Sequence, residues 1–136
     1  MAGVSPYEKQ LREVCAIINR KLGLPEPVLV FQSRSGRPED SWLEPDVCQY
    51  LRAERSVGLA AAVICPIGFV CDHVEVLYDL DTEARALCDE LGIQMVRAGT
   101  AGTHPKMVQL IAELAQREHT PCAATCCPAP IAPVRR

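Results

Sequence analysis

The sequence lacks the features that mark nucleic-acid-binding, membrane-spanning and secreted proteins. Basic residues are not in excess: 14 Lys and Arg against 17 Asp and Glu give a net charge of −3, so nothing favours a nucleic-acid partner. The longest apolar run, residues 59–70, is broken by Pro66 and Gly68 and is too short to cross a bilayer. No apolar secretory segment follows the N-terminus, and no internal repeat is visible. We therefore expect a cytoplasmic protein.

What is present is a globular composition that is rich in cysteine. Hydrophobic residues make up 49% of the 136 residues, enough for one domain with its own core. We expect that domain to cover residues 1–118 and a Cys- and Pro-rich tail to cover residues 119–136. Four of the eight cysteines fall within expected helices or strands, where a free thiol is usually a small core residue. These four are Cys15, Cys48, Cys65 and Cys88.

Helical and strand patterns alternate along the chain. Ser5, Pro6 and Glu8 form a capping box before the first helix, and Gly23 and Gly92 end helices. Helices are expected over residues 7–22, 45–55, 72–91 and 105–118, and strands over residues 27–31, 59–65 and 93–96. This alternation predicts an α/β domain with a parallel sheet and right-handed crossovers.

The segment of residues 62–81 carries the candidate chemistry. Its strand is apolar and free of charge, which is typical of a strand covered on both faces. Asp72, His73 and Glu75 follow where the strand ends, and their side chains can bind a metal or move a proton. In open α/β sheets ligands bind at that edge of the sheet.

Helical spacing places four acidic side chains of this segment on one face. They are Asp72, Glu75, Asp79 and Glu83. One interpretation is a solvated acidic face, because carboxylates are favoured near a helix N-terminus. The other is a metal site that includes His73, because an imidazole and a carboxylate suit a borderline divalent cation.

A second polar segment follows the first expected strand and should lie at the same edge of the sheet. Arg34 can form a bidentate pair with a carboxylate of a ligand, and Trp42 can lie against a flat ring. Alternatively, Arg34 makes an internal salt bridge and Trp42 is a core residue.

Three stretches together resemble the C-terminal half of ferrochelatase, the enzyme that inserts ferrous iron into a porphyrin in haem synthesis. They are Gly68–Asp81, Gln32-Ser33-Arg34-Ser35-Gly36 and Trp42-Leu43-Glu44-Pro45. The likeness covers residues 7–118 and needs no insertion between the motifs. It implies a three-layer α/β parallel-sheet domain of the class II chelatase type, one of the two ferrochelatase halves, with protoporphyrin IX or coproporphyrin III as substrate.

The resemblance also implies catalytic and metal-binding roles. Glu75 looks like the family's metal-handling glutamate and His73 like the histidine beside it, and both would be catalytic. Asp72, Asp79 and Glu83 resemble an acidic ladder that carries metal in or protons out. Such bases are needed because metallation releases two pyrrole protons.

Further roles fall on the second polar segment and on the last helix. By resemblance, the porphyrin would be contacted by Gln32, Ser33, Arg34 and Trp42. Glu113 occupies the place of an acidic residue that the family associates with catalysis, and an exposed helical glutamate is an equal alternative.

The chain departs from the family in length. Ferrochelatases carry a further histidine in their first half, in a Ser-Ala-His-Ser-like motif, and neither His104 nor His119 matches it. We expect the chain to begin just downstream of that motif. We expect the missing N-terminal half or a second copy of the chain to complete the site, because a lone half leaves an apolar cleft wall exposed. Peripheral membrane contact is a further expected interaction.

Cysteines near the site and in the tail are the other departure. Cys71 stands where the family has a small or hydroxyl residue, so it is either a ligand for a soft metal or, as we expect, a small side chain. Three tail cysteines resemble in position the ligands of the [2Fe–2S] cluster of some ferrochelatases: Cys122, Cys126 and Cys127. A cluster needs four ligands, so the fourth would come from the missing half. Zinc binding or no ligand at all are the alternatives.

Other functions fit the same residues. A non-catalytic metal- or haem-binding module would bind tightly without inserting metal. A half-length homodimeric cobalt or nickel chelatase of related fold would use the same donors, because histidine and carboxylates accept iron, cobalt and nickel alike. A plain α/β interaction domain would bind neither porphyrin nor metal.

Overall fold

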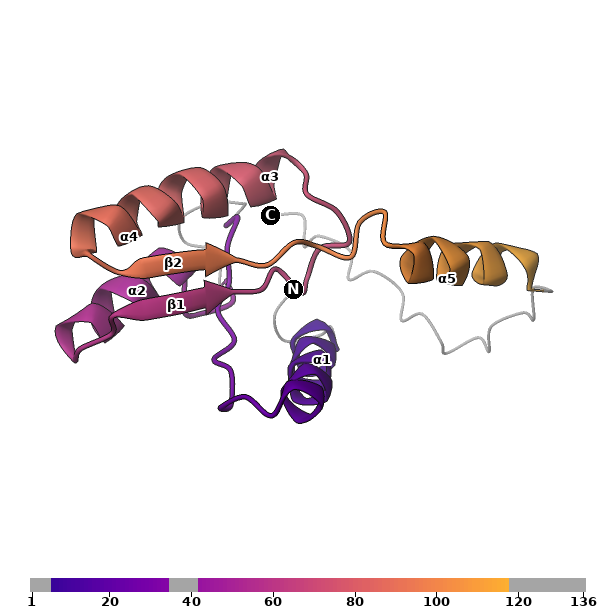
Figure 1. Cartoon of the computed structure of the whole chain (residues 1–136), viewed down its shortest axis with the longest axis horizontal. Helices are drawn as coiled ribbons and strands as arrows, with labels where there is room; N and C mark the ends of the chain where they lie inside the picture. The colour runs from indigo at the N-terminus through magenta and orange to yellow at the C-terminus, as the bar shows by residue number, and fades with distance from the viewer. Residues whose placement is uncertain (1–5, 35–41, 118–136) are drawn as a thin grey trace, which may run out of the picture. The chain divides into compact units, whose positions relative to one another are not determined.

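The computed structural model describes residues 6–34 and 42–117 of the chain. These residues belong to two compact units, one that ends at Thr103 and one that starts at His104. The first unit contains α1 (Tyr7–Leu22), α2 (Val47–Ser56), β1 (Ala61–Ile64), α3 (Val74–Val76), the π-helix η1 (Leu77–Ala84), α4 (Arg85–Leu91) and β2 (Gln94–Arg97); the second contains α5 (Pro105–Gln116) (Figure 1). The mixed α/β class expected from the sequence is confirmed.

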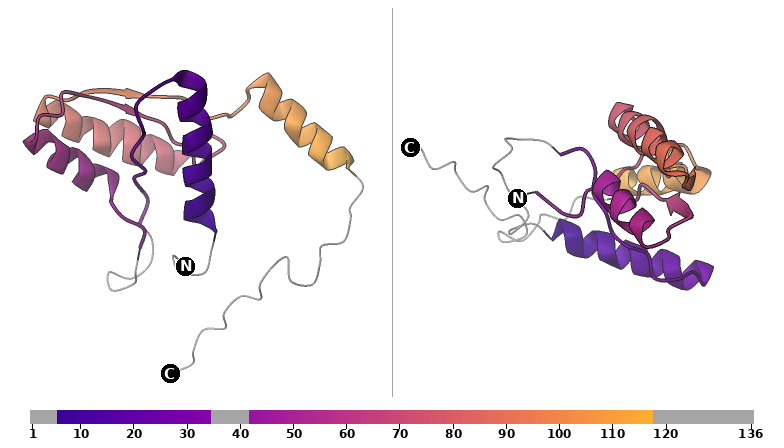
Figure 2. Two further views of the ribbon diagram at one scale, coloured as in Figure 1. Left: turned by 90° about the horizontal axis from the view of Figure 1, so that it is seen from below. Right: turned by 90° about the vertical axis from the view of Figure 1, so that its left-hand side faces the viewer.

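The two strands of the first unit pair in parallel, with Ala61 opposite Gln94 and Ile64 opposite Arg97. One continuous helix, formed by α3, η1 and α4, connects them, as a parallel pair requires. Helix α2 and this connecting helix lie on the same side of the sheet (Figure 2). The buried side chains lie between these layers, and each buried valine or leucine contributes about 1.5–3 kcal/mol. The fully buried ones are Val76, Leu80, Ala84 and Cys88.

The other face of the sheet is open, so the expectation that β1 is covered on both faces is wrong. Val63 is 77% exposed and Val96 is 61% exposed. An apolar, charge-free strand has the same sequence pattern whether both of its faces are packed or only one. Val63 also lines a cavity bordered by α1 and residues 27–33, so at this point the strand faces a hollow and not a packed layer.

The expected strand over residues 27–31 is also wrong as a strand. Phe31 forms a single parallel bridge with Asp46: the Phe31 N–H donates to the Pro45 carbonyl at 2.9 Å, and the Val47 N–H donates to the Phe31 carbonyl at 2.8 Å. The segment is extended, as its composition favours, but a ladder also needs a neighbouring strand in register. Here a cavity separates residues 27–31 from β1.

Helix ends follow local capping chemistry. Gly23 and Gly92 end α1 and α4 in the left-handed conformation, as expected. Pro6 is the N-cap of α1 and makes no side-chain cap bond; Ser5, which the expected capping box needs, lies outside the described residues. Helix α2 starts at Val47 and not at residue 45, since the carboxylate of Asp46 accepts hydrogen bonds from two backbone N–H groups of the first turn.

The cysteines expected in the core divide into different environments. Cys88 is fully buried, which confirms the expectation for that residue. Cys15 and Cys48 are half-buried, and Cys65 is exposed, so for Cys65 the expectation is wrong. Burial raises the pKa of the Cys88 and Cys48 thiols, which keeps both neutral at physiological pH.

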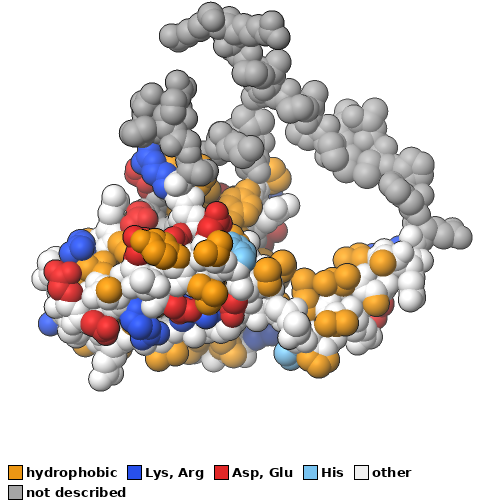
Figure 3. Space-filling view, turned by 90° about the horizontal axis from the view of Figure 1, so that it is seen from above, with side chains coloured by type: hydrophobic (Ala, Val, Ile, Leu, Met, Phe, Trp, Pro, Cys, Tyr) orange, Lys and Arg blue, Asp and Glu red, His pale blue; other side chains and the backbone are white. Residues whose placement is uncertain are grey.

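Helix α5 of the second unit is amphipathic and has no buried residue. Hydrophobic side chains cover much of its visible surface in Figure 3. The exposed ones are Val108, Leu110, Ile111 and Leu114. Within residues 6–34 and 42–117, no helix is long and apolar enough to span a bilayer.

Candidate functional site

A cavity of about 780 Å³ lies between α1, the extended residues 27–33 and the carboxyl end of β1. Most of its lining is apolar, with Trp42 and Phe69 among the aromatic side chains. The polar or charged residues in the lining are Glu8, Gln32, Ser33 and Glu75, with Tyr7 and Tyr50 as phenols. A large apolar cavity with a few convergent polar groups is the usual form of a small-molecule site.

Three of the four expected porphyrin contacts lie in this lining: Gln32, Ser33 and Trp42. Trp42 is half-buried. Arg34 is exposed and is not among the lining residues. The structure therefore brings the loop after residue 31 to the cavity, as the sequence predicted for this edge.

His73 and Glu75 meet at the first turn of α3. His73 is the N-cap, and its Nδ1 accepts a hydrogen bond from the Glu75 N–H at 3.2 Å. Its ring packs edge-on against Phe69, with the ring centroids 4.6 Å apart. Glu75 is exposed and lines the cavity, whereas His73 is half-buried and does not.

The capping hydrogen bond of His73 decides which ring nitrogen carries the proton in the neutral imidazole. Because Nδ1 accepts a hydrogen bond, the proton of the neutral ring is on Nε2. In this state Nε2 can donate a hydrogen bond but cannot bind a metal. Metal binding through Nε2 would require the proton to move to Nδ1, which would break the cap.

Asp79 lies on η1 and is tied to the loop that lines the cavity. The Ser33 hydroxyl donates to the Asp79 carboxylate, and Gln32 Nε2 donates to Ser33 Oγ at 3.4 Å. Glu83, on the same helix, is exposed. The π-helical form of residues 77–84 was not expected from the sequence; π-helices are rare and frequently occur at functional sites.

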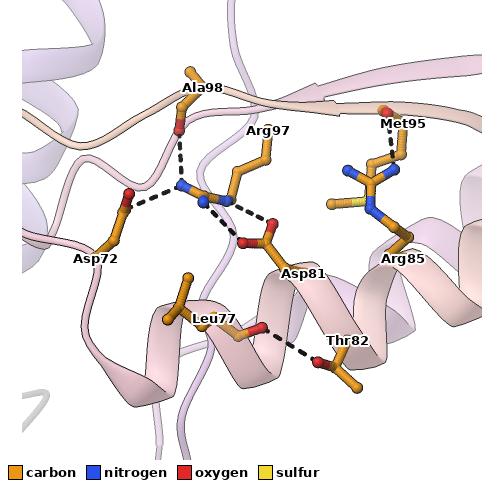
Figure 4. A network of polar contacts seen from close by, with 8 residues as sticks. All are labelled: Asp72, Leu77, Asp81, Thr82, Arg85, Met95, Arg97 and Ala98. Atoms are coloured by element: carbon orange, nitrogen blue, oxygen red, sulfur yellow. Dashed lines mark hydrogen bonds and ion pairs between the residues drawn. The ribbon is translucent and has the colours of Figure 1, made fainter.

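Asp72 does not belong to this row of helical carboxylates, so the expected face of four acids is wrong. The helix begins at Val74, and Asp72 precedes the cap. Its carboxylate accepts from Arg97 Nη1 at 3.0 Å (Figure 4). Asp72 is therefore paired with the end of β2 and does not continue the row of carboxylates on the helix.

Arg97, at the end of β2, connects the segment before α3 to η1 through its pairs with Asp72 and Asp81. Its Nε and Nη2 donate to the two carboxylate oxygens of Asp81 at 2.6 and 2.8 Å, and its Nη1 also reaches the Ala98 carbonyl at 3.3 Å (Figure 4). The hydrogen bond from Arg97 lowers the pKa of the Asp81 carboxyl group. Sequence reasoning missed this pair; the available signal was an arginine at the carboxyl end of an expected strand.

The remaining candidate residues fall outside this cavity or outside the described chain. Glu113 lies on α5 in the second unit, where its carboxylate accepts from Gln109 Nε2 at 2.8 Å. Cys71 is exposed. Cys122, Cys126 and Cys127 lie outside the described residues. Within the part of the chain that the structure describes, no three His, Cys, Asp or Glu side chains are grouped closely enough to hold a metal ion.

Comparison with known proteins places the chain in a family. The family model described as Ferrochelatase matches residues 2–119. The chain is 51% identical over 117 residues to the ferrochelatase of Rhodopirellula baltica, covering 85% of this chain and 33% of that protein. It is 43% identical over 121 residues to the coproporphyrin III ferrochelatase of Streptomyces coelicolor, covering 82% and 32%, respectively. The coproporphyrin III ferrochelatase of Nocardia farcinica is 38% identical over 151 residues, covering 96% of this chain and 42% of the relative.

The chain thus spans about a third of the length of the first two of these relatives. The resemblance carried by residues 32–36, 42–45 and 68–81 is confirmed. Since the family model covers most of the chain, including all of the described residues, the chain belongs to the ferrochelatase family.

Proposed function

We propose that this chain forms the metal-handling part of a ferrochelatase, which inserts ferrous iron into protoporphyrin IX or coproporphyrin III. One observation carries the proposal: Glu75 lines a largely apolar cavity of about 780 Å³ whose lining also includes Trp42 and Phe69. A tetrapyrrole is flat and apolar with carboxylate substituents, so an apolar wall with aromatic side chains suits it.

Glu75 acts as the base that accepts the pyrrole protons. Insertion of a divalent metal replaces two pyrrole protons, which must leave the ring. Glu75 is exposed at the cavity, so its carboxylate can take a proton and pass it to solvent. Asp79 and Glu83 lie four and eight residues after Glu75 on the same continuous helix. They offer further acceptors for protons or transient ligands for the metal.

His73 has a positioning and donating role in the proposal. Its cap fixes the first turn of α3 and hence the Glu75 backbone. The Nε2–H of the neutral ring can donate to a carboxylate or to a metal-bound water. Iron is a substrate that must leave with the porphyrin, so a weak donor set is an advantage.

The porphyrin-binding part of the proposal rests on Gln32, Ser33 and Trp42, which line the cavity. Arg34 pairs with a propionate of the porphyrin in this proposal, because it belongs to the family motif. Two of the three relatives described above are coproporphyrin III ferrochelatases by name, and both porphyrins stay within the proposal.

We also propose that a further polypeptide completes the site, either an N-terminal half or a second copy of the chain. The open valine face of the sheet supports this, since contiguous exposed apolar surface marks interaction sites. The three-layer class II chelatase fold and the division into residues 1–118 and a tail belong to the same proposal. So do the catalytic role of Glu113 and a [2Fe–2S] cluster through Cys122, Cys126 and Cys127. The cytoplasmic location and peripheral membrane contact stay predictions.

Porphyrin fluorescence tests the proposal. The full chain is mixed with the upstream half of the Rhodopirellula baltica ferrochelatase, and ferrous iron is added to bound porphyrin without oxygen. Quenching should follow metal addition in the wild type and be lost in Glu75→Gln, with porphyrin affinity unchanged. Glu90→Gln, an exposed glutamate on α4, is the matched control.

Each alternative predicts a different result in the same assay. Equal quenching by Glu75→Gln and wild type would remove the role given to Glu75. Saturable porphyrin binding without insertion, with or without the upstream half, would favour a binding module. Insertion of cobalt or nickel by the chain alone would favour a half-length homodimeric chelatase. If the chain binds no porphyrin, with or without the upstream half, the proposal is overturned.

A further inference from the structure

Arg97 connects β2 to the helix after β1 at two points, one before α3 and one after it. Its Nε and Nη2 donate to the carboxylate of Asp81 at 2.6 and 2.8 Å, and its Nη1 donates to Asp72 at 3.0 Å (Figure 4). The Arg97 side chain is only 13% exposed, so solvent screens these pairs less than those of an exposed arginine. The proposed reaction uses neither Arg97 nor Asp81.

The apolar pattern of the helix fits two registers. In the observed register the fully buried side chains are spaced by four residues throughout: Val76, Leu80, Ala84 and Cys88. In an α-helix each such step drifts by about 40° around the axis, because a turn takes 3.6 residues. The wider turns of η1 reduce this drift. In a regular α-helix, Leu77 in the place of Val76 would complete the usual stripe of three- and four-residue spacings, and Leu77 is 44% exposed in the structure.

The two registers bring different residues to the cavity. A π-helix holds about one residue more than α-helical turns of the same span, so a change to the α form turns the preceding residues by one position, roughly 100°. Leu77 would then take the place of Val76 in the core, and Val76 would take the place of Glu75 at the cavity. Glu75 would move to the place of Val74, which is 75% exposed. The π form is therefore the one in which Glu75 lines the cavity.

The pair between Arg97 and Asp81 distinguishes the two registers, whereas the apolar side chains do not. Asp81 lies within η1, so its direction toward β2 changes with the form of the helix. A bidentate pair of guanidinium and carboxylate tolerates little change in geometry. A second link between this helix and β2, from Arg85 Nη1 to the Met95 carbonyl at 3.3 Å, starts in α4 and does not depend on the form of η1.

We propose that Arg97 is a positioning residue for Glu75. Its pairs with Asp81 and Asp72 hold residues 77–84 in the π form, and this form places Glu75 at the cavity. The consequence for metal insertion rests on the proposed function, but the effect of Arg97 on the helix does not.

NMR couplings across hydrogen bonds, measured on the isotope-labelled full chain, distinguish the two forms. In the π form the Arg85 N–H donates to the Leu80 carbonyl, and in an α-helix it donates to the carbonyl of Asp81. The coupling should therefore move from Leu80 to Asp81 in Arg97→Gln, with the far-ultraviolet dichroism of the wild type retained. Arg97→Lys, which keeps the charge but not the planar fork, should show both couplings. Arg85→Gln, the matched control, should keep the Leu80 coupling.

Leu77→Gln supplies a rescue, because the α form needs Leu77 in the core and the π form does not. In the double variant of Arg97→Gln and Leu77→Gln the coupling should return to Leu80. The proposal is overturned if the Leu80 coupling persists in Arg97→Gln, if Leu77→Gln fails to restore it, or if Arg85→Gln also loses it.

Iron insertion in the presence of the upstream half tests the consequence for Glu75. Arg97→Gln should insert iron at least about tenfold more slowly, because a displaced base is out of reach of the porphyrin, while porphyrin affinity stays unchanged. The double variant should recover the rate. An unchanged rate in Arg97→Gln, despite the altered coupling, would overturn the positioning role. If the couplings change as expected but the wild type inserts no iron, the proposed function fails and the effect of Arg97 on the helix stands.

Discussion

The hydroxyl group of Ser33 donates a hydrogen bond to the carboxylate of Asp79, 46 positions further along the chain. Ser33 adopts a left-handed backbone conformation, with φ of 59°, which a non-glycine residue rarely occupies. This bond joins the loop of the expected porphyrin contacts to the helix that carries the acidic side chains. The loop and the helix of the candidate site are therefore directly connected by a side-chain hydrogen bond.

Ser33→Ala should separate the loop from η1. It removes the hydrogen bond and keeps the unfavourable backbone conformation, so unfolding free energy should fall by about 1 kcal/mol and porphyrin affinity should fall with it. Ser33→Gly removes the same bond but relieves the backbone, and should be the more stable of the two variants. Urea denaturation and porphyrin titration measure both effects. Unchanged porphyrin affinity in both variants would show that the Ser33–Asp79 bond does not organise the loop.

Asp81→Asn should remove a pH-dependent part of the stability. The hydrogen bond from Arg97 holds the pKa of the Asp81 carboxyl below the ordinary value of 3.8. The ionised form therefore stabilises the fold above that value, and the contribution is lost as pH falls through the lowered pKa. The variant should lose about 1–2 kcal/mol at pH near 7, and the difference from wild type should shrink at pH near 3.

The control for that series is Glu90→Gln, an exposed charge change on α4. Urea denaturation at both pH values gives the comparison. A difference between Asp81→Asn and wild type that stays constant from neutral to acid pH would mean that the ion pair with Arg97 contributes nothing to the pH dependence.

Substitutions of His73 separate its cap from its imidazole chemistry. His73→Ala removes both and should cost about 1 kcal/mol of unfolding free energy, the usual cost of a lost N-cap. His73→Asn keeps an acceptor oxygen at the cap and should recover that stability. If the Nε2–H of His73 takes part in metal insertion, His73→Asn should still quench porphyrin fluorescence more slowly than wild type. Wild-type quenching rates in His73→Asn would leave the residue with a capping role alone.

Gly68→Ala should disturb the start of α1. The new Cβ would lie 2.8 Å from the Tyr7 hydroxyl oxygen, closer than van der Waals contact allows. Overpacking of this kind costs about 1–3 kcal/mol where neighbours cannot move; Tyr7 can shift at its far end, so we expect the lower limit. Thermal unfolding of Gly68→Ala, Tyr7→Phe and the double variant measures the coupling. The double variant should be more stable than the sum of the single effects, and additive effects would exclude this contact as the cause.

Much of the local structure follows from short-range sequence signals. Gly23 and Gly92 end their helices because a left-handed C-terminal residue favours glycine. The long apolar–polar periodicity predicted α1 and the helix after β1 with boundaries within two residues of the observed ones. These features depend on nearest neighbours along the chain, so a single sequence contains them.

Features that depend on distant partners could not be predicted in the same way. Residues 27–31 look like a strand, but a cavity lies where the pairing strand should be. Arg97 carries no local mark of its partners, since Asp81 and Asp72 precede it by 16 and 25 positions. The structure brings Gln32, Ser33 and Glu75 to one cavity, a tertiary arrangement that periodicity does not encode, and their roles there stay a prediction from the family motif.

Val63 and Val96 stand directly opposite each other in the register of β1 and β2, and both are on the open face of the sheet. Removing one valine side chain from water is worth about 1.5–3 kcal/mol. The free energy of a solution of the chain therefore falls whenever another surface covers this valine pair. The midpoint of thermal unfolding should rise with protein concentration, and Val63→Thr combined with Val96→Thr should abolish that dependence.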